Sequence, residues 1–195
     1  MTTFDVYTPA SAPAQSKEIL GQWQERLGFP PNALGVMSES PALLRGYDAL
    51  WHVFEGGSFS LIERAVINMT ISGLSGSSYD VAAYTNFGAM RGVPMDVLTA
   101  LREERPLADA RLEALRGYVA KVVKSMGRVD GRDVDAFIKA GFSKAQSLEV
   151  ILGLSINAIL NTVNHLAAPV LDKAFEPHRI DYSRRPAAGK SSNAA

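Results

Sequence analysis

The clearest hydrophobic pattern in the chain lies between residues 62 and 90. Its first half is apolar on nearly every side, which indicates a helix that is buried all round. Glycine and serine residues at 72–76 then break the helix, because they allow the backbone to turn. Ser77, Asp80 and Tyr84 follow at positions i, i+3 and i+7, which places their side chains along one stripe of a second helix. We therefore predict a small-molecule pocket beside this polar stripe.

Helical periodicity also runs through the rest of the chain, and no convincing strand pattern accompanies it. The sequence therefore predicts an all-α fold. We expect an extended N-terminal arm over residues 1–15, a single helical domain over 16–175 and a flexible C-terminal tail over 176–195. The other helices are expected at residues 17–27, 41–54, 95–102, 109–126 and 134–140, and in a long segment that begins at Ser143.

The composition is that of a soluble globular domain, with 47% apolar residues in 195. Lysine plus arginine and aspartate plus glutamate both number 20, so the chain has no global charge with which to hold nucleic acid or an anionic membrane. No apolar run approaches the ~20 residues of a membrane span, and the first residues lack a basic leader followed by an apolar core. We expect a cytoplasmic protein without nucleic-acid or membrane partners.

The chain contains no cysteine, which excludes disulfides, thiolate catalysis and thiolate metal sites. Its three histidines, His52, His165 and His178, are far apart and show no ligand spacing. A metal site assembled from all three in space is the weaker alternative. We predict that the protein binds no metal and no cofactor.

Residues 64–85 resemble the signature of the alkylhydroperoxidase D (AhpD)-like and carboxymuconolactone decarboxylase family. Its redox form reads roughly R-E, an apolar helix, then N-G-C-x-Y-C-x-A-A-H-T, and here the helix is followed by S-G-S-S-Y-D-V-A-A-Y-T. Two further segments, 27–44 and 161–166, also resemble family motifs. The resemblance covers roughly 14–175 and implies an AhpD-like helical bundle that forms a homo-oligomer, a trimer, hexamer or dimer.

The chain departs from the redox pattern at every position that carries the chemistry. Ser77 and Asp80 stand where the two cysteines would be, Tyr84 where the histidine would be, and Ala65 where the glutamate would be. Thiol peroxidase activity is therefore not expected, because no thiolate exists to attack a peroxide. The decarboxylase branch of the family works without redox cysteines, so the resemblance still permits acid/base chemistry.

Three residues are candidates for that chemistry. A buried Asp80 would have a raised pKa and could transfer a proton, or it could simply bond Tyr84 or the helix N-terminus. Tyr84 could donate a hydrogen bond to a developing oxyanion, although a core tyrosine with its hydroxyl on Asp80 explains it slightly better. His52 is the nearest histidine to the motif and a possible base, but a surface position is the more ordinary one.

Four further residues are candidates for substrate binding: Ser77, Tyr79, Arg64 and Trp51. Ser77 is better explained as a helix cap, since Ser77-x-x-Asp80 resembles a capping box. Arg64 matches the family's arginine, and a structural ion pair is its more ordinary role.

The sequence favours a cofactor-free acid/base enzyme, such as a lyase or decarboxylase, an isomerase or a hydrolase, acting on a small organic substrate. Two alternatives stay open. One is an inactive AhpD-like pseudoenzyme that binds a small ligand without turnover. The other is an oligomeric structural or partner-binding protein, whose own side chains would fill the pocket.

Overall fold

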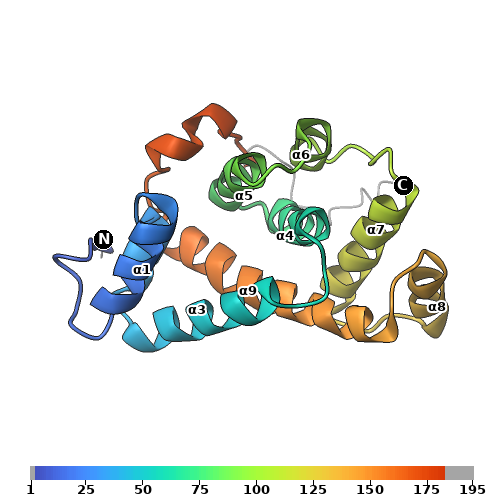
Figure 1. The fold of residues 1–195 in the computed structure, drawn as a ribbon, viewed down its shortest axis with the longest axis horizontal. Helices are drawn as coiled ribbons and strands as arrows, with labels where there is room; N and C mark the ends of the chain where they lie inside the picture. Colours follow the sequence, from blue (N-terminus) through green and yellow to red (C-terminus); the bar gives the residue numbers. More distant parts are fainter. Residues whose placement is uncertain (1–2, 183–195) are drawn as a thin grey trace, which may run out of the picture.

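The computed structural model describes residues 3–182, and within this range the chain forms nine α-helices and one short 3₁₀ helix, with no β-strand (Figure 1). The prediction of an all-α fold is confirmed. The elements are α1 (Lys17–Leu27), α2 (Asn32–Met37), α3 (Pro41–Glu55), α4 (Leu61–Ser75), α5 (Ser78–Met90), α6 (Met95–Arg102), α7 (Ala110–Ser125), α8 (Gly131–Lys139), α9 (Lys144–Ala167) and the 3₁₀ helix η1 (Lys173–His178).

The ends of α4 follow from its terminal residues. Ser60 and Glu63 form a capping box, in which Ser60 N donates to Glu63 Oε2 at 2.7 Å and Glu63 N donates to Ser60 Oγ at 3.4 Å. Two N–H groups at the start of the helix are thereby satisfied. At the other end Gly76 has φ 74°, a left-handed conformation that glycine adopts most easily. α5 begins two residues later, so the motif predicted from the sequence forms a helical hairpin.

α4 lies at the centre of the molecule, where it packs against α5, α6, α7 and α9 (Figure 1). Val66 and Ile67 are completely buried, and each such side chain contributes about 1.5–3 kcal/mol when it leaves water. The predicted burial on all sides is confirmed for this part of the helix. It does not extend to the last turn, where Leu74 is 40% exposed.

α9 packs tightly against both α3 and α4 at Gly153. A Cβ atom at this position would lie 2.5 Å from Ile67 Cγ2 and 3.4 Å from Phe54 Cζ. Real Cβ atoms do not come that close to another carbon, because the interior is packed to van der Waals contact. Glycine at 153 therefore allows three helices to meet at one point.

A polar seam, buried except at its Ser75 end, joins α4 to α9 and is formed by Asn68, Ser72 and Ser75 on α4 and by Asn157 and Asn161 on α9. Asn157 Nδ2 donates to Asn68 Oδ1 at 2.8 Å, and its Oδ1 accepts from Ser72 Oγ at 3.0 Å. Asn161 Nδ2 donates to Ser75 Oγ at 2.8 Å. Because these buried groups satisfy one another, the seam avoids the 1–3 kcal/mol that each unpaired group would cost, roughly.

Residues 176–182, which the sequence assigned to a flexible tail, are instead held against the hairpin. Tyr182 is buried, its N–H donates to Ser78 Oγ at 3.0 Å, and its hydroxyl donates to the carbonyl of Arg102 at 2.7 Å. The buried ring of Tyr182, with Ile180 packed against the core, holds this segment in place. The rest of the predicted tail, 183–195, lies outside the described residues.

α9 also presents an apolar surface to solvent, on which Leu148 and Leu166 are 68% and 72% exposed and Ile151 is half exposed. Within residues 3–182, α9 is the one helix long and apolar enough to cross a membrane. Core helices of soluble proteins pass the same test, and α9 contributes Val150, Ile156 and other buried residues to the core. The length and composition of α9 alone therefore do not identify it as a membrane-spanning helix.

The predicted homo-oligomer stays a prediction, and the exposed apolar side of α9 is where we expect a second copy to pack. The double variant Leu148→Glu/Ile151→Glu is expected to lower the mass measured by sedimentation equilibrium, because two buried charges would oppose association. Met126→Glu, which replaces an exposed apolar residue outside α9, is the control. An oligomer that survives the double variant unchanged would place the interface elsewhere.

Candidate functional site

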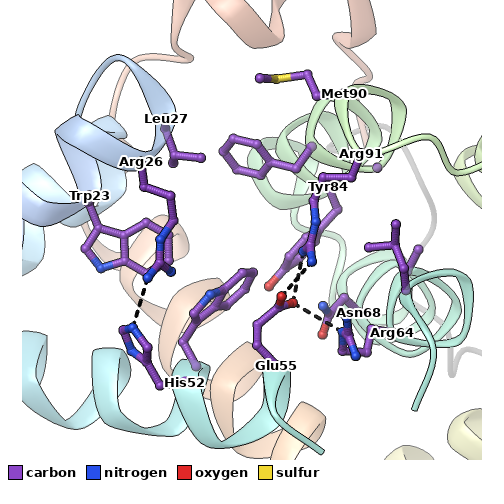
Figure 2. A pocket seen from close by; sticks show the side chains of 15 residues that line it. Trp23, Arg26, Leu27, His52, Glu55, Arg64, Asn68, Tyr84, Met90 and Arg91 are labelled. Atoms are coloured by element: carbon purple, nitrogen blue, oxygen red, sulfur yellow. Dashed lines mark hydrogen bonds and ion pairs between the residues drawn. The ribbon is translucent and has the colours of Figure 1, made fainter.

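A cavity of about 520 Å³ opens between α1, α3, α4 and α5 (Figure 2). Its volume lies in the range of pockets that hold small organic molecules. The lining residues are Trp23, Arg26, Leu27, Trp51, His52, Glu55, Leu61, Arg64, Ala65, Asn68, Tyr84, Phe87, Gly88, Met90 and Arg91.

The structure brings four of the sequence-predicted site residues to this cavity: Tyr84, His52, Arg64 and Trp51. It does not bring Asp80, Ser77 or Tyr79 there. Ala65, at the position of the family's glutamate, also lines the cavity. The positions of the family's glutamate and histidine therefore face the open space, whereas the two cysteine positions do not.

Aromatic and aliphatic side chains make most of the cavity wall. The indoles of Trp23 and Trp51 meet edge to face, with ring centroids 5.4 Å apart, and Phe87 and Leu61 also contribute to the wall. The chain has two tryptophans in all, and both line the cavity. Intrinsic tryptophan fluorescence therefore reports on this site.

Tyr84 is buried, and its hydroxyl has no hydrogen-bond partner among the described residues. Burial raises the pKa of this hydroxyl well above its ordinary value, with smaller contributions from Tyr47, Asp80 and Glu55, so the group stays protonated and can donate. The predicted bond to Asp80 is not formed, because both oxygens of Asp80 have other partners. Figure 2 shows the hydroxyl pointing toward Glu55. An unpaired buried donor is rare and points to a missing acceptor.

Asp80 is completely buried behind the cavity wall. Ser77 Oγ donates to Asp80 Oδ2, and Asn164 Nδ2 donates to Asp80 Oδ1 at 2.7 Å. Burial raises the pKa of Asp80 to about 7, although both hydrogen bonds work in the opposite direction. Asn164 of α9 covers this side of α5, so the Asp80 carboxyl faces α9 and does not line the cavity. Helical spacing alone does not reveal this contact.

Ser77 and Tyr79 also have structural partners. Ser77 precedes α5 at the N-cap position, but its side chain accepts no capping hydrogen bond and donates to Asp80 instead. The predicted capping contact is therefore wrong. The Tyr79 hydroxyl donates to Asp172 and accepts from Ala33 N at 3.2 Å, which ties α5 to α2 and to the segment before η1.

His52 lies at the solvent-facing rim of the cavity, with half of its side chain exposed. Its Nε2 lies 3.0 Å from Arg26 Nη2, and its Nδ1 lies 2.8 Å from the carbonyl of Asp48. Because a guanidinium can only donate, Nε2 accepts and Nδ1 carries the proton. The hydrogen bond from Arg26 thus occupies the one lone pair of the ring (Figure 2), and Oδ2 of Asp48 lies 3.5 Å from Nδ1.

Glu55 is a cavity residue that sequence reasoning missed. Arg91 donates to its two oxygens at 3.1 and 2.7 Å, and Arg64 Nε lies 3.3 Å from Oε1 without the alignment of a hydrogen bond (Figure 2). Burial raises the pKa of Glu55, but the Arg91 hydrogen bond and three nearby guanidinium charges outweigh it and leave the pKa below its ordinary value. Glu55 is thus an ionised anchor for two arginines. Its place three residues after His52 on α3 is the signal that could have found it.

No group of three histidine or acidic side chains with the geometry to hold a metal occurs in the part of the chain that the structure describes. The lining residues also contain no cluster of carboxylates, since Glu55 is the one acidic residue among them. What the arrangement offers chemically is an apolar space, the hydroxyl of Tyr84, the imidazole of His52 and three guanidinium groups.

No protein-family model and no curated protein matches the chain. Solved structures do match. The debrominase Bmp8, as a cysteine-to-alanine variant in complex with 2,3,4-tribromopyrrole, aligns with TM-score 0.76 at 18% identity over 91% of this chain and 95% of its own. A peroxidase-related protein with an AhpD core from Ralstonia eutropha JMP134 has TM-score 0.75 and 17% identity, over 88% and 93%. A peroxidase-related protein from Silicibacter sp. TM1040 has TM-score 0.75 and 19% identity, over 89% and 93%.

Identities of 17–19% establish a common fold rather than a common activity. The likeness extends over nearly the full length of each chain, and the AhpD-like fold predicted from the motif is confirmed. The chain is therefore a cysteine-free protein with the AhpD-like helical fold.

Proposed function

We propose that the protein binds a small, largely apolar organic molecule in the cavity between α1, α3, α4 and α5. The observation that carries this proposal is the buried, unpaired hydroxyl of Tyr84 beside a cavity of about 520 Å³. A bound molecule with a hydrogen-bond acceptor would supply the partner that the protein does not, while its apolar part would lie against Trp23 and Trp51.

Cofactor-free acid/base catalysis on that molecule is the activity that we propose for the site. Tyr84 would donate to an oxygen on which negative charge develops, and His52 Nε2 would accept a proton once Arg26 has moved from it. Asp80 does not line the cavity, so this geometry supports no direct contact between its carboxyl and a substrate. Tyr84 and His52 are therefore the residues to which we assign the chemistry.

Binding without turnover is the second candidate, and a specific observation favours it. Both groups of the cavity that could accept a proton have partners, His52 with Arg26 and Glu55 with Arg91 and Arg64. Incubation with a bound compound and analysis by mass spectrometry separate the two candidates, since only the enzyme changes the compound.

The comparison with Bmp8 supports a small aromatic ligand, because that protein, with the same fold, was crystallised with 2,3,4-tribromopyrrole. A reaction through a thiolate is not open to this chain, which has no cysteine. If the two proteins share a property, we therefore expect it to be the shape of the ligand that they bind and not a reaction at cysteine.

Tyr84→Phe is expected to weaken the binding of acetophenone about fivefold and to leave the binding of ethylbenzene unchanged. The hydroxyl would contribute about 1 kcal/mol through a hydrogen bond to the ketone, and ethylbenzene has no acceptor. The quenching of tryptophan fluorescence measures both affinities. Tyr118→Phe, which alters a buried tyrosine outside the cavity, is the matched control. An equal loss for both compounds would contradict the assigned hydrogen bond.

A further inference from the structure

The charges around the cavity are unbalanced. Three arginines, Arg26, Arg64 and Arg91, line it together with a single carboxylate, Glu55. Glu55 is ionised and is shared by Arg64 and Arg91, and His52 supplies no negative charge. The lining therefore carries an excess of positive charge, which in a largely apolar space favours an anionic ligand.

Of the three cavity arginines, Arg26 is the one that forms no salt bridge with a described residue, and the charge of Glu55 acts on it only at longer range. Its hydrogen-bonding partner is His52 Nε2, at 3.0 Å, which is neutral. A neutral nitrogen is a weaker acceptor for a guanidinium than a carboxylate is, because hydrogen bonds between charged groups are about twice as strong. Arg26 can therefore gain from exchanging His52 for an anion.

Two contacts orient the side chain of Arg26 in the structure. It lies in the last turn of α1, and its guanidinium carbon lies 5.1 Å from the centre of the Trp23 ring (Figure 2). Stacking on an indole and bonding to His52 restrict the side chain from two sides. The N–H groups of its guanidinium therefore lie next to the apolar wall that an aromatic ring would contact.

We propose that the ligand of this cavity is a small aromatic carboxylate, whose carboxylate binds Arg26 at the rim and whose ring lies against the wall formed by Trp23 and Trp51. This proposal rests on the proposed function and adds the chemical class of the ligand. The hydroxyl of Tyr84, on α5, is then available to a second acceptor at the other end of those aromatic carboxylates that carry one. The ligand takes the place of His52 on Arg26, which leaves the Nε2 lone pair of His52 free.

Calorimetric titration with 1-naphthoate and with its neutral counterpart 1-naphthamide tests the proposal. The wild-type protein is expected to bind 1-naphthoate at least about tenfold more tightly at low ionic strength, with the preference falling as salt screens the charge. Arg26→Gln is expected to remove this preference while the affinity for 1-naphthamide stays the same. Arg26→Lys, which keeps the positive charge but loses the paired donors of the guanidinium, is expected to keep part of the preference for 1-naphthoate.

Arg45→Gln is the matched control, because Arg45 is an exposed arginine of α3 outside the cavity lining. Circular dichroism verifies that each variant is folded. Equal affinity of the wild-type protein for both compounds, or a preference that persists in Arg26→Gln, would overturn the carboxylate site and leave the proposed binding function intact. If neither compound binds and tryptophan fluorescence does not respond to ethylbenzene either, both proposals fail.

Discussion

Asp80→Asn is expected to raise the free energy of unfolding by roughly 3–4 kcal/mol at pH 8 and by roughly 1–2 kcal/mol at pH 5. The pKa of Asp80 rises from its ordinary 3.8 to about 7 in the folded protein because the carboxyl is buried. The folded protein therefore keeps the proton between about pH 4 and pH 7, whereas the unfolded chain has released it. Stability falls as the pH rises through this window and stays low above it.

Asparagine has the shape of aspartate and carries no charge, so it removes this penalty. Its side chain can still accept from Asn164 Nδ2, and its amide can donate to Ser77 Oγ. Urea unfolding at pH 5 and pH 8 measures the effect, with Asp96→Asn, an exposed aspartate of α6, as the control. Wild-type stability that is the same at both pH values, or a variant that is less stable at pH 8, would show that Asp80 is not a strained buried carboxyl.

Gly153→Ala is expected to lower the melting temperature by about 4–8 °C, which corresponds to a loss of about 2 kcal/mol for a chain of this length. Alanine favours a helix over glycine by about 1 kcal/mol. The new Cβ would nevertheless lie 2.5 Å from Ile67 Cγ2, and Ile67 is completely buried and cannot move aside freely. Overpacking of this kind typically costs about 1–3 kcal/mol or more, and here it outweighs the gain in helix propensity.

Gly117→Ala provides a matched comparison on α7. Nothing lies within 4 Å of the Cβ that this substitution adds, so it is expected to stabilise the protein by up to about 1 kcal/mol through helix propensity alone. Differential scanning calorimetry of both variants gives the two shifts. If both variants melt higher than the wild-type protein, the close approach of α9 to α4 is not a constraint on stability.

The sequence was informative wherever a local rule decides the structure. The apolar run before Gly76 predicted the central helix, and the breaks at glycine and proline predicted most of the other boundaries. The motif also led to Tyr84, Arg64 and His52, all of which line the cavity. Each of these inferences depends on residues within a few turns of one another, or on a family pattern with fixed spacing.

The rest of the site depends on contacts between distant helices. Arg26 and Trp23 come from α1, far from the motif in sequence, and nothing in their local pattern connects them with it. Asp80 was predicted at the cavity because helical spacing places it on the same stripe as Tyr84. Spacing gives the direction of a side chain from its helix but not what covers it, and Asn164 of α9 covers Asp80.

The polar seam between α4 and α9 has a consequence for redesign of the cavity. Asn157 and Asn161 lie one turn apart on α9, so sliding α9 by one turn, about 5.4 Å, would leave only one of the two amides with partners on α4, and the seam therefore favours the present register between the two helices. Asn68 belongs both to the seam and to the cavity lining, whereas Leu61 and Ala65 line the cavity without contributing a seam hydrogen bond. Variant libraries at Leu61 and Ala65 can therefore change which ligand binds without disturbing the packing of α4 on α9. In libraries at Asn68, a loss of binding could come from a changed cavity or from a damaged fold.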